Sequence, residues 1–451
     1  MLMHRLLPEK NLAALRTKNP SLAATLEQHV VNFQNMELAE TKDGVQTLRY
    51  RHANGDREQH TWVHSRYHPL QEAARFAERL ANESTIMLYG FGLGYQVREL
   101  TARLSQNQRL HILECNMDLL HTAFSLTDFS AIILMDNVTF LHADSPIDAL
   151  SIIAMAESQN ASLAIYKPAL NCLDNAYEDL KLHLTRQLIP GRNEIRQKLA
   201  AANHHANMGV QSNPIQQLFS RHLGETAVIV SSGPSLNIVK AALKTLPENI
   251  VVLCAGSALR PLMESGIRVN YIVVMDALPN VRKQLKGFEQ LDIPLLFSNF
   301  TCADAIKAYT GPKYMYLCET IPGFPEVQAI SSGGSVATAA VAIALKMGIK
   351  RMIFAGQDLC FVDEHHHAEG AWHQQSTRTR DLANYIRVRN VKTQWVSTSP
   401  KLLAYRKWLE NTIAEQRTTV TFYNIAEQGL PIAGAEHLNA NQLHQIINGC
   451  T

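Results

Sequence analysis

The sequence predicts an α/β protein with two parallel-sheet units, and three observations carry this prediction. Strand-like apolar runs alternate with helical segments over 85–145 and again from 226 to 356. In each of these regions a strand ends in a glycine turn that opens a helix. The chain has 451 residues, of which 46% are hydrophobic, so it carries enough apolar side chains for more than one core.

The first elements along the chain are predicted to be a β-hairpin and a helix. Two partly alternating runs in 45–64 flank Asn54-Gly55-Asp56, where glycine permits the left-handed backbone of a tight turn. A helix follows, because apolar residues then recur at helical spacing, namely Leu70, Ala73, Phe76, Ala77 and Leu80.

The N-terminal parallel unit contains a strand that ends in a G-x-G-x-G turn. Its glycines are Gly90, Gly92 and Gly94, and Glu114 closes the next strand. Glycines let a backbone approach a ligand, and a carboxylate at the second strand can hold ribose hydroxyls. The alternative is a Rossmann-like unit that keeps the tight turn for packing alone, and the sequence leaves both interpretations open.

The second parallel unit is predicted from six strands, at 226–231, 250–255, 271–276, 294–298, 314–317 and 351–356. The unpatterned segment 201–213 before them is the best candidate for an interdomain connection. We therefore expect a hairpin and helix region over 1–66, a Rossmann-like unit over 67–200, a central α/β unit over 214–375 and a C-terminal helical region over 376–451. The last is predicted from the shared face of Leu402, Tyr405, Leu409 and Ile413.

The strongest candidate binding motif is the turn after the first strand of the central unit. In it Gly233, Pro234 and Ser235 open a helix, and Pro234 pre-sets the backbone of the first turn. We expect free backbone N–H groups here to point at one spot and to favour an anionic phosphate. No G-K-[ST] follows, so this is not a lysine-containing ATP loop.

Two further strand ends in the same unit should lie beside this turn. Gly256 and Ser257 follow the second strand, and Asp276 ends the third. In open parallel sheets ligands collect outside the carboxyl ends of the strands, so these residues should converge with Gly233 and Ser235 on one crevice. Asp276 is a candidate for ribose or metal, and a capping carboxylate is the alternative.

A second glycine-rich helix start and an acidic, histidine-rich segment complete the set of candidates. Gly333-Gly334-Ser335 precedes an apolar helix and is another anion-friendly start. Gln357 and Asp358 then follow a strand, and three histidines at 365–367 come after them. Adjacent histidines rarely bind one ion together, so we predict no metal ligands and favour His367 as a general base or phosphate donor.

Composition limits the class of partner. The 42 Lys plus Arg residues exceed the 40 Asp plus Glu residues by 42 − 40 = 2, so a large basic face for nucleic acid is not expected. The seven cysteines form no C-x-x-C pair and are predicted to be reduced thiols. No apolar stretch is long enough for a membrane span or a signal peptide, which predicts a cytoplasmic protein.

The segment 226–376 resembles the family of bacterial motility accessory factors that modify flagellin, whose core domain is similar to 6-hydroxymethylpterin diphosphokinase. The likeness rests on SSGPSLN at 231–237, AGSALRPLMESGIRVNYIVVMD at 255–276, SSGGSVATAA at 331–340, and FAGQDLCF with the following His367. GFGLGY at 90–95 and the tail 391–434 also look like parts of this family.

The resemblance implies a glycosyltransferase with a sialyltransferase-like central unit. The family is thought to transfer a nonulosonic acid of the pseudaminic, legionaminic or sialic type from a CMP-activated donor to Ser or Thr of flagellin. It implies that Gly233, Pro234 and Ser235 contact the CMP phosphate. The resemblance also implies that the nucleotide pocket is completed by Ser257, Asp276 and the Gly333-Gly334-Ser335 turn. It implies that the catalytic residues near the reacting carbon are Gln357, Asp358 and His367.

Two other functions stay open from the sequence. One is a diphosphokinase resembling the pterin enzyme, which would use ATP and Mg²⁺. The other is a non-catalytic flagellin-binding protein. Metal dependence, the particular sugar and homo-oligomerisation are likewise left open by the sequence.

Overall fold

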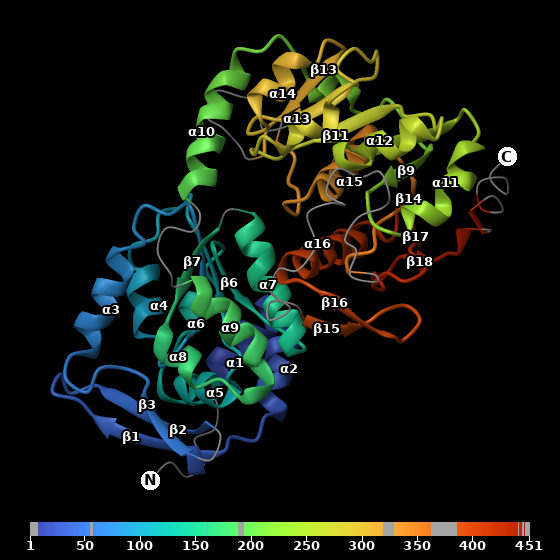
Figure 1. The fold of residues 1–451 in the computed structure, drawn as a ribbon. Coiled ribbons are helices and arrows are strands. Elements are labelled where there is room, and N and C mark those ends of the chain that lie inside the picture. Colours follow the sequence, from blue (N-terminus) through green and yellow to red (C-terminus); the bar gives the residue numbers. More distant parts are fainter. Residues whose placement is uncertain are drawn as a thin grey trace. The chain divides into compact units, whose positions relative to one another are not determined.

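The structure is a computed structural model that describes residues 8–54, 57–159, 161–187, 194–318, 329–361, 386–440, 442–443 and 446. The chain divides into two compact units, Met1–Pro190 and Gly191–Thr451 (Figure 1). The N-terminal hairpin region and the first parallel unit thus belong to one body. The central and C-terminal regions belong to the other.

The N-terminal unit contains a small antiparallel sheet of order β1-β2-β3. Its strands are β1 (Met36–Glu40), β2 (Gln46–Asn54) and β3 (Arg57–Trp62). Strands β2 and β3 pair from Arg49↔Trp62 to Asn54↔Arg57, which confirms the predicted hairpin. Before the sheet come α1 (Glu9–Lys18), α2 (Pro20–Gln28) and the 3₁₀ turn η1 (Phe33–Asn35), and after it comes the predicted helix, α3 (Pro69–Glu78).

A parallel sheet of order β6-β5-β4-β7 forms the centre of the same unit. Its strands are β4 (Thr85–Tyr89), β5 (Arg109–Leu113), β6 (Val138–Leu141) and β7 (Ser162–Ile165). Its helices are α4 (Tyr95–Thr101), α5 (Met117–Leu126), α6 (Ser130–Ile133), α7 (Pro146–Ser158), α8 (Lys167–Asn171) and α9 (Glu178–Gln187), with η2 (Asn175–Tyr177). This is the strand and helix alternation that the sequence predicts for 85–145.

The C-terminal unit is built on a nine-stranded sheet of order β18-β17-β14-β9-β10-β11-β12-β13-β8, in which every neighbouring pair is parallel. Six of its strands are the predicted ones: β9 (Thr226–Val230), β10 (Ile250–Ala255), β11 (Tyr271–Val274), β12 (Leu295–Ser298), β13 (Lys313–Tyr316) and β14 (Arg351–Ala355). The others are β8 (Asn213–Pro214), β17 (Thr421–Ile425) and β18 (Glu436–His437).

Helices cover both faces of this sheet. One apolar cluster joins alternate strand residues such as Val228 and Ile353 to α11 (Leu236–Lys244), α12 (Gly256–Glu264), α13 (Asn280–Leu285) and α14 (Ala303–Ala308). Helix α15 (Val336–Met347) contacts β9, β10 and β11, and its buried residues lie outside that cluster, so it packs on the opposite face. The unit also contains α10 (Glu194–Met208), η3 (Ile215–Leu218) and α16 (Pro400–Gln416).

The order of the strands places a topological switch point between β9 and β14. From β9 the chain builds β10, β11, β12 and β13 outward on one side, and β14 and β17 then follow on the other side (Figure 1). In open α/β sheets, ligands bind in the crevice outside the carboxyl ends of the strands at this point. The loops after β9 and β14 therefore determine what the unit can bind.

The structure corrects the interdomain connection expected at 201–213. Residues 201–208 form the second half of α10 and are anchored to the C-terminal unit. The Asn203 side chain donates to the Ala277 carbonyl at 2.9 Å, and the buried Asn207 side chain donates to the Asn299 carbonyl at 3.1 Å. Asn203 and Asn207 look like part of a polar linker in the sequence, but in the structure their side chains donate hydrogen bonds to loops that follow strands of the sheet.

The C-terminal region contains strands as well as the predicted helix. Helix α16 buries Tyr405, Leu409 and Ile413 as expected. Around it, β15 (Ile386–Arg389) and β16 (Trp395–Thr398) form an antiparallel ribbon, and β17 extends the large sheet beside β14. In the described part of the chain, no helix is long and apolar enough to cross a membrane.

Candidate functional site

The glycine turn of the N-terminal unit is filled by side chains of the protein itself. A Cβ at Gly90 would lie 2.7 Å from the Ala169 Cβ, and one at Gly92 would lie 2.8 Å from His64 Nε2. At Gly94 a Cβ would overlap the Phe129 ring. Close backbone approach is thus used for packing, which is the second of the two interpretations left open by the sequence.

Glu114 is committed to the same turn rather than to a ligand. Its Oε2 accepts the Phe91 N–H at 2.8 Å and its Oε1 accepts the Asn116 N–H at 2.9 Å. The side chain is 3% exposed, and burial raises the pKa of its carboxyl while these backbone bonds oppose the rise. Both Glu114 oxygens hold backbone amides, so this carboxylate supports the packing interpretation and not the ribose interpretation.

Alanine substitutions at Gly94, in this turn, and at Gly44, in another turn of the same unit, should separate the cost of steric overlap from the cost of backbone strain. Gly94 has φ +83° and abuts Phe129, whereas Gly44 has φ +73° and open space within 4 Å of the point that a Cβ would occupy. Gly44→Ala should cost about 1 kcal/mol from left-handed strain alone. Gly94→Ala should cost about 2–4 kcal/mol because overpacking is added. Urea unfolding followed by circular dichroism measures both, and equal losses would contradict the packing role.

In the C-terminal unit, the loops after β9 and β14 meet at the switch point. The Ser231 hydroxyl donates to Gln357 Oε1 at 2.6 Å, across 126 residues of sequence. The Ser235 N–H and hydroxyl both donate to Asp358 Oδ2, at 3.0 and 2.9 Å. The structure thus brings Gln357 and Asp358 together with the predicted turn around Gly233.

The amides of this turn are not free, contrary to the sequence-based expectation. The Ser231 N–H donates to the Ala355 carbonyl at 2.8 Å, and the Gly233 N–H donates to the Gly356 carbonyl at 2.9 Å. The Ser235 N–H is taken by Asp358. The start of α11 therefore holds the carboxylate of this chain at the position where we expected a phosphate, and Pro234 has no N–H to offer.

Asp358 is a buried carboxylate held at a helix start. It is 2% exposed, and its Oδ1 has no hydrogen-bond partner in the part of the chain that the structure describes. Burial raises the pKa of the Asp358 carboxyl to about 6, against the two Ser235 hydrogen bonds, which lower it. A group so enclosed orients the turn through Ser235.

The polar side chains of this edge that do not contact Asp358 include Gln357 and Ser257. Gln357 is 7% exposed, and its Oε1 is held by Ser231 while its Nε2 has no partner among the described residues. The Ser232 and Ser257 hydroxyls lie 2.9 Å apart, which joins the loop after β9 to the start of α12. The N-cap of α12, Ala255, gives its first turn no side-chain acceptor.

Two predicted residues near this edge have local structural roles. Asp276 follows β11, where its Oδ1 accepts the Leu278 N–H at 3.2 Å and its carbonyl accepts the Cys302 N–H at 3.0 Å. The Oδ1 bond is an Asx turn in the loop before α13, whose N-cap is Pro279, so Asp276 braces this loop. A Cβ at Gly256 would lie 2.7 Å from Gln284 Oε1, so glycine at that position admits the Gln284 side chain.

The Gly333-Gly334-Ser335 turn serves helix α15. Ser335 forms a capping box, in which its hydroxyl accepts the Thr338 N–H at 3.1 Å and its own N–H donates to the Thr338 hydroxyl at 3.1 Å. Gly334 has φ +80°, and a Cβ at Gly333 would lie 2.7 Å from the Trp408 Cβ of α16. These contacts explain the residue types without a ligand.

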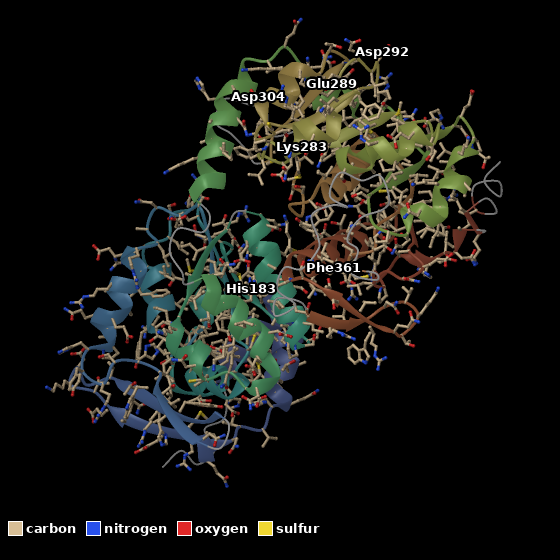
Figure 2. The ribbon with its side chains drawn as sticks, in the orientation of Figure 1. His183, Lys283, Glu289, Asp292, Asp304 and Phe361 are labelled. Atoms are coloured by element: carbon tan, nitrogen blue, oxygen red, sulfur yellow. The ribbon has the colours of Figure 1, made fainter. Side chains whose placement is uncertain are left out.

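The histidine prediction lies beyond the part of the chain that the structure describes. His365, His366 and His367 fall in 362–385, which begins just after Phe361 (Figure 2). Phe361 pairs with Ser397 in an isolated antiparallel bridge. Among the described residues, no three His, Cys, Asp or Glu side chains are grouped closely enough to hold a metal ion.

Sequence reasoning missed Ser231, Ser232 and the inward seating of Asp358. The serines belong to the same small-residue run as Gly233, so their presence at the turn was visible. Their hydrogen-bond partners could not be predicted, because Ser257 and Gln357 follow other strands of the sheet. The signal that could have pointed to them is the strand order, which puts β10 and β14 on either side of β9.

The fold and the site define a doubly wound α/β protein with polar side chains gathered at the switch point of its large sheet. Comparison with family models matches residues 31–139 to the glycosyltransferase Maf N-terminal domain and residues 200–364 to the 6-hydroxymethylpterin diphosphokinase MptE-like domain. Together these matches identify the chain as a member of the Maf glycosyltransferase family. It is accordingly a glycosyltransferase.

Comparison with solved structures finds the Maf glycosyltransferase from Magnetospirillum magneticum AMB-1. The identity is 15% and the TM-score 0.48, over 96% of this chain and 74% of that one. No curated protein matches the sequence.

Proposed function

We propose that the protein transfers a nonulosonic acid of the pseudaminic, legionaminic or sialic type from a CMP-activated donor to Ser or Thr hydroxyls of flagellin. The observation that carries this proposal is the Ser231–Gln357 hydrogen bond at the switch point. It leaves a donating amide at the edge of the sheet where nucleotides bind in such folds. The site lies within the MptE-like region of a glycosyltransferase.

The donor phosphate is best accommodated at the start of α12 rather than at α11. The α11 start already holds the Asp358 carboxylate, whereas the N-cap of α12, Ala255, makes no side-chain cap hydrogen bond to the first turn, which is flanked by the Ser232 and Ser257 hydroxyls. A helix N-terminus and neutral donors would stabilise the negative charge of departing CMP. Gly233, Pro234 and Ser235 then support this site by seating Asp358.

The remaining steps need a proton acceptor for the Ser or Thr hydroxyl. Asp358 is buried and hydrogen-bonded to Ser235, so we assign it a positioning role. His367 is the group we propose as base, since the ordinary pKa of a histidine lies near neutrality. Direct displacement by the acceptor with CMP leaving would invert the anomeric carbon and needs no covalent intermediate.

The acceptor and the setting come from the family resemblance. We propose that flagellin is modified before export, which requires a cytoplasmic enzyme and makes the modification part of flagellum assembly and motility. A diphosphokinase acting on a pterin with Mg²⁺-ATP is the second candidate. The MptE-like description of residues 200–364 favours it.

Incubation of the full chain with flagellin and a CMP-activated nonulosonic acid tests the proposal. The expected result is a sugar-sized mass increase on flagellin, detected by intact-mass spectrometry, together with release of CMP. The control omits the donor. Phosphate transfer from Mg²⁺-ATP to 6-hydroxymethylpterin, without any flagellin mass shift, would instead support the second candidate and overturn the first.

A further inference from the structure

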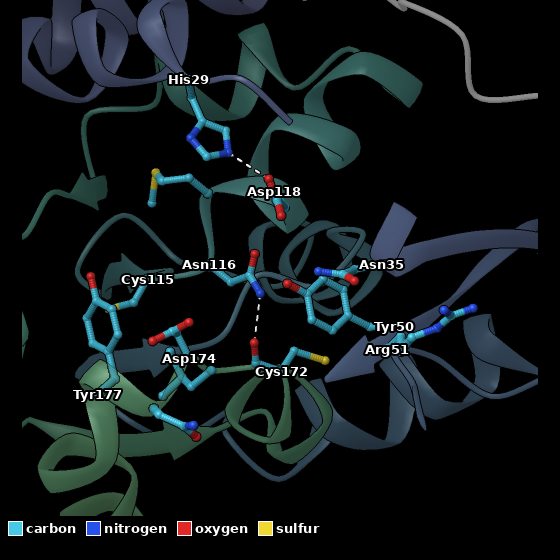
Figure 3. A pocket seen from close by; sticks show the side chains of 13 residues that line it. His29, Asn35, Tyr50, Arg51, Cys115, Asn116, Asp118, Cys172, Asp174 and Tyr177 are labelled. Atoms are coloured by element: carbon cyan, nitrogen blue, oxygen red, sulfur yellow. Dashed lines mark hydrogen bonds and ion pairs between the residues drawn. The ribbon is translucent and has the colours of Figure 1, made fainter. Parts of the chain in front are cut away.

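A cavity of about 510 Å³ lies in the N-terminal unit (Figure 3). Its walls come from the segment before β1, from β2, from the turn after β5 and from the segment after α8. The cavity is therefore at the carboxyl end of β5, an edge at which parallel sheets bind ligands. Its volume is in the range of about 300–1,000 Å³ that small-molecule sites occupy.

The walls of this cavity are braced by hydrogen bonds between its own lining residues. Asn116 Nδ2 donates to the Cys172 carbonyl at 2.7 Å, and His29 Nε2 lies 2.7 Å from Asp118 Oδ1, as the dashed lines in Figure 3 show. Asp118 also accepts the Asn32 N–H at 3.1 Å. Three segments far apart in sequence are thereby tied to one another, so the cavity is a built feature of the unit.

Other lining groups have hydrogen-bonding capacity left over. In the region that the structure describes, the side chains of Asn35, Asn175 and Tyr177 make no hydrogen bond although each lines the cavity. Asp174 uses Oδ1 to accept the Ala176 N–H at 2.8 Å, and this leaves Oδ2 available. The cavity therefore offers amide donors, a phenol and carboxylate and amide acceptors at the same place.

The charges and the neighbouring turn disfavour a phosphorylated ligand. Among the described residues lining the cavity, Arg51 is the sole Lys or Arg, and two carboxylates, Asp118 and Asp174, line it as well. The Gly90–Gly94 turn, where a Rossmann-like unit would hold phosphate, is packed with His64 and Phe129. The turn that would hold phosphate in such a unit is therefore closed, while the cavity beyond the end of β5 is open.

We propose that this cavity is a second small-molecule site, which binds an uncharged, hydroxyl-rich ligand of the carbohydrate class. Hydroxyls of a sugar can donate to the Asp174 carboxylate and accept from the amides of Asn35 and Asn175. The rings of Tyr50 and Tyr177 give apolar surface for its C–H faces. The site is independent of the donor site, because it uses no residue of the C-terminal unit.

Ligand-observed NMR on the full chain tests this with a panel of glucose, galactose, N-acetylglucosamine and maltose, and with cytidine and adenosine as nucleoside probes. The variants are Asn175→Ala and Tyr177→Phe, whose side chains make no hydrogen bond that the described fold would lose. Asn107→Ala is the matched control, since Asn107 is an exposed residue in the loop before β5, at the opposite edge of the sheet.

The expected result is saturable binding of at least one neutral sugar. Its affinity should fall about tenfold in each cavity variant, which corresponds to loss of one hydrogen bond of about 1.4 kcal/mol, and should be unchanged in Asn107→Ala. Binding of the nucleosides alone, binding that the cavity variants leave unchanged, or no binding of any sugar would overturn the proposal.

Discussion

Asp358→Asn is expected to stabilise the protein at pH 8 by about 3 kcal/mol. Asparagine keeps an Oδ1 that can accept both Ser235 hydrogen bonds, but it removes a charge from a position that is 2% exposed. The pKa of this carboxyl rises from 3.8 to about 6 on folding. When the carboxyl is ionised, the folded state is therefore destabilised relative to the unfolded chain by roughly 1.4 kcal/mol per pKa unit.

The pH dependence gives this prediction its sign. Because the folded-state pKa is raised, the folded protein binds more protons than the unfolded chain between pH 3.8 and about 6. The stability contributed by this group is therefore fully present below pH 3.8 and is lost as the pH rises through about 6. Asp358→Asn should lack this decline when unfolding free energies are measured by urea titration from pH 4 to pH 8.

Asp292→Asn is the matched control for Asp358→Asn. Asp292 is an exposed aspartate of the same unit (Figure 2), so its charge stays in water in the folded protein. Its substitution should leave the pH profile of wild type unchanged. Equal stability of Asp358→Asn and wild type at pH 8 would show that the buried carboxylate is not the destabilising charge described above.

Gln357→Ala is expected to lower the rate of sugar transfer by about a hundredfold without unfolding the protein. Ser231 holds the Gln357 Oε1, and the Gln357 Nε2 has no partner among the described residues. In the proposed reaction this amide stabilises charge on the departing nucleotide. Loss of one preorganised donor of this kind typically costs about 10²–10³ in kcat. The measurement is the rate of flagellin mass increase with a CMP-activated donor.

Two further variants make the Gln357→Ala result specific. Ser231→Ala keeps the amide but removes the hydroxyl that orients it, so we expect a loss of about tenfold, as for a single hydrogen bond. Gln290→Ala removes the side chain of an exposed glutamine of the same unit and should have no effect. Full activity of Gln357→Ala would remove Gln357 from the site.

Much of the architecture follows from the sequence because parallel strands buried on both faces are continuous apolar runs. The runs at Val228, Val252 and Ile272 became β9, β10 and β11, and small-residue or acidic turns marked their carboxyl ends. The edge of the sheet at which ligands bind in such folds could be predicted in the same way, because its position depends on strand order and not on individual contacts.

The seating of the carboxylates could not be predicted. Glu114 and Asp358 each follow a strand, as ligand-binding acids do, yet each accepts an N–H from the glycine turn of a neighbouring strand. Whether such an acid faces a ligand or its own backbone depends on side-chain orientation, which residue spacing does not encode. For the same reason, the backbone N–H groups at the start of α11 were expected to be available to a phosphate.

The C-terminal strands were hidden by their composition. In β15 the buried Ile386 and Val388 alternate with the exposed Arg387 and Arg389, and this short pattern sits within a basic stretch that resembles a solvated surface. Arg389 stacks 4.1 Å from the centroid of the Trp395 ring of β16. Such a ribbon depends on cross-strand pairs, which become visible only once its register is known.

Calorimetric titration of the full chain with CMP, with and without Mg²⁺, tests most directly whether the β9–β14 edge is a nucleotide site. We predict saturable CMP binding that does not require Mg²⁺ and that Gln357→Ala weakens while Gln290→Ala does not. Absence of CMP binding, or heat released only on addition of Mg²⁺-ATP, would contradict the assignment of this edge to a CMP-activated donor.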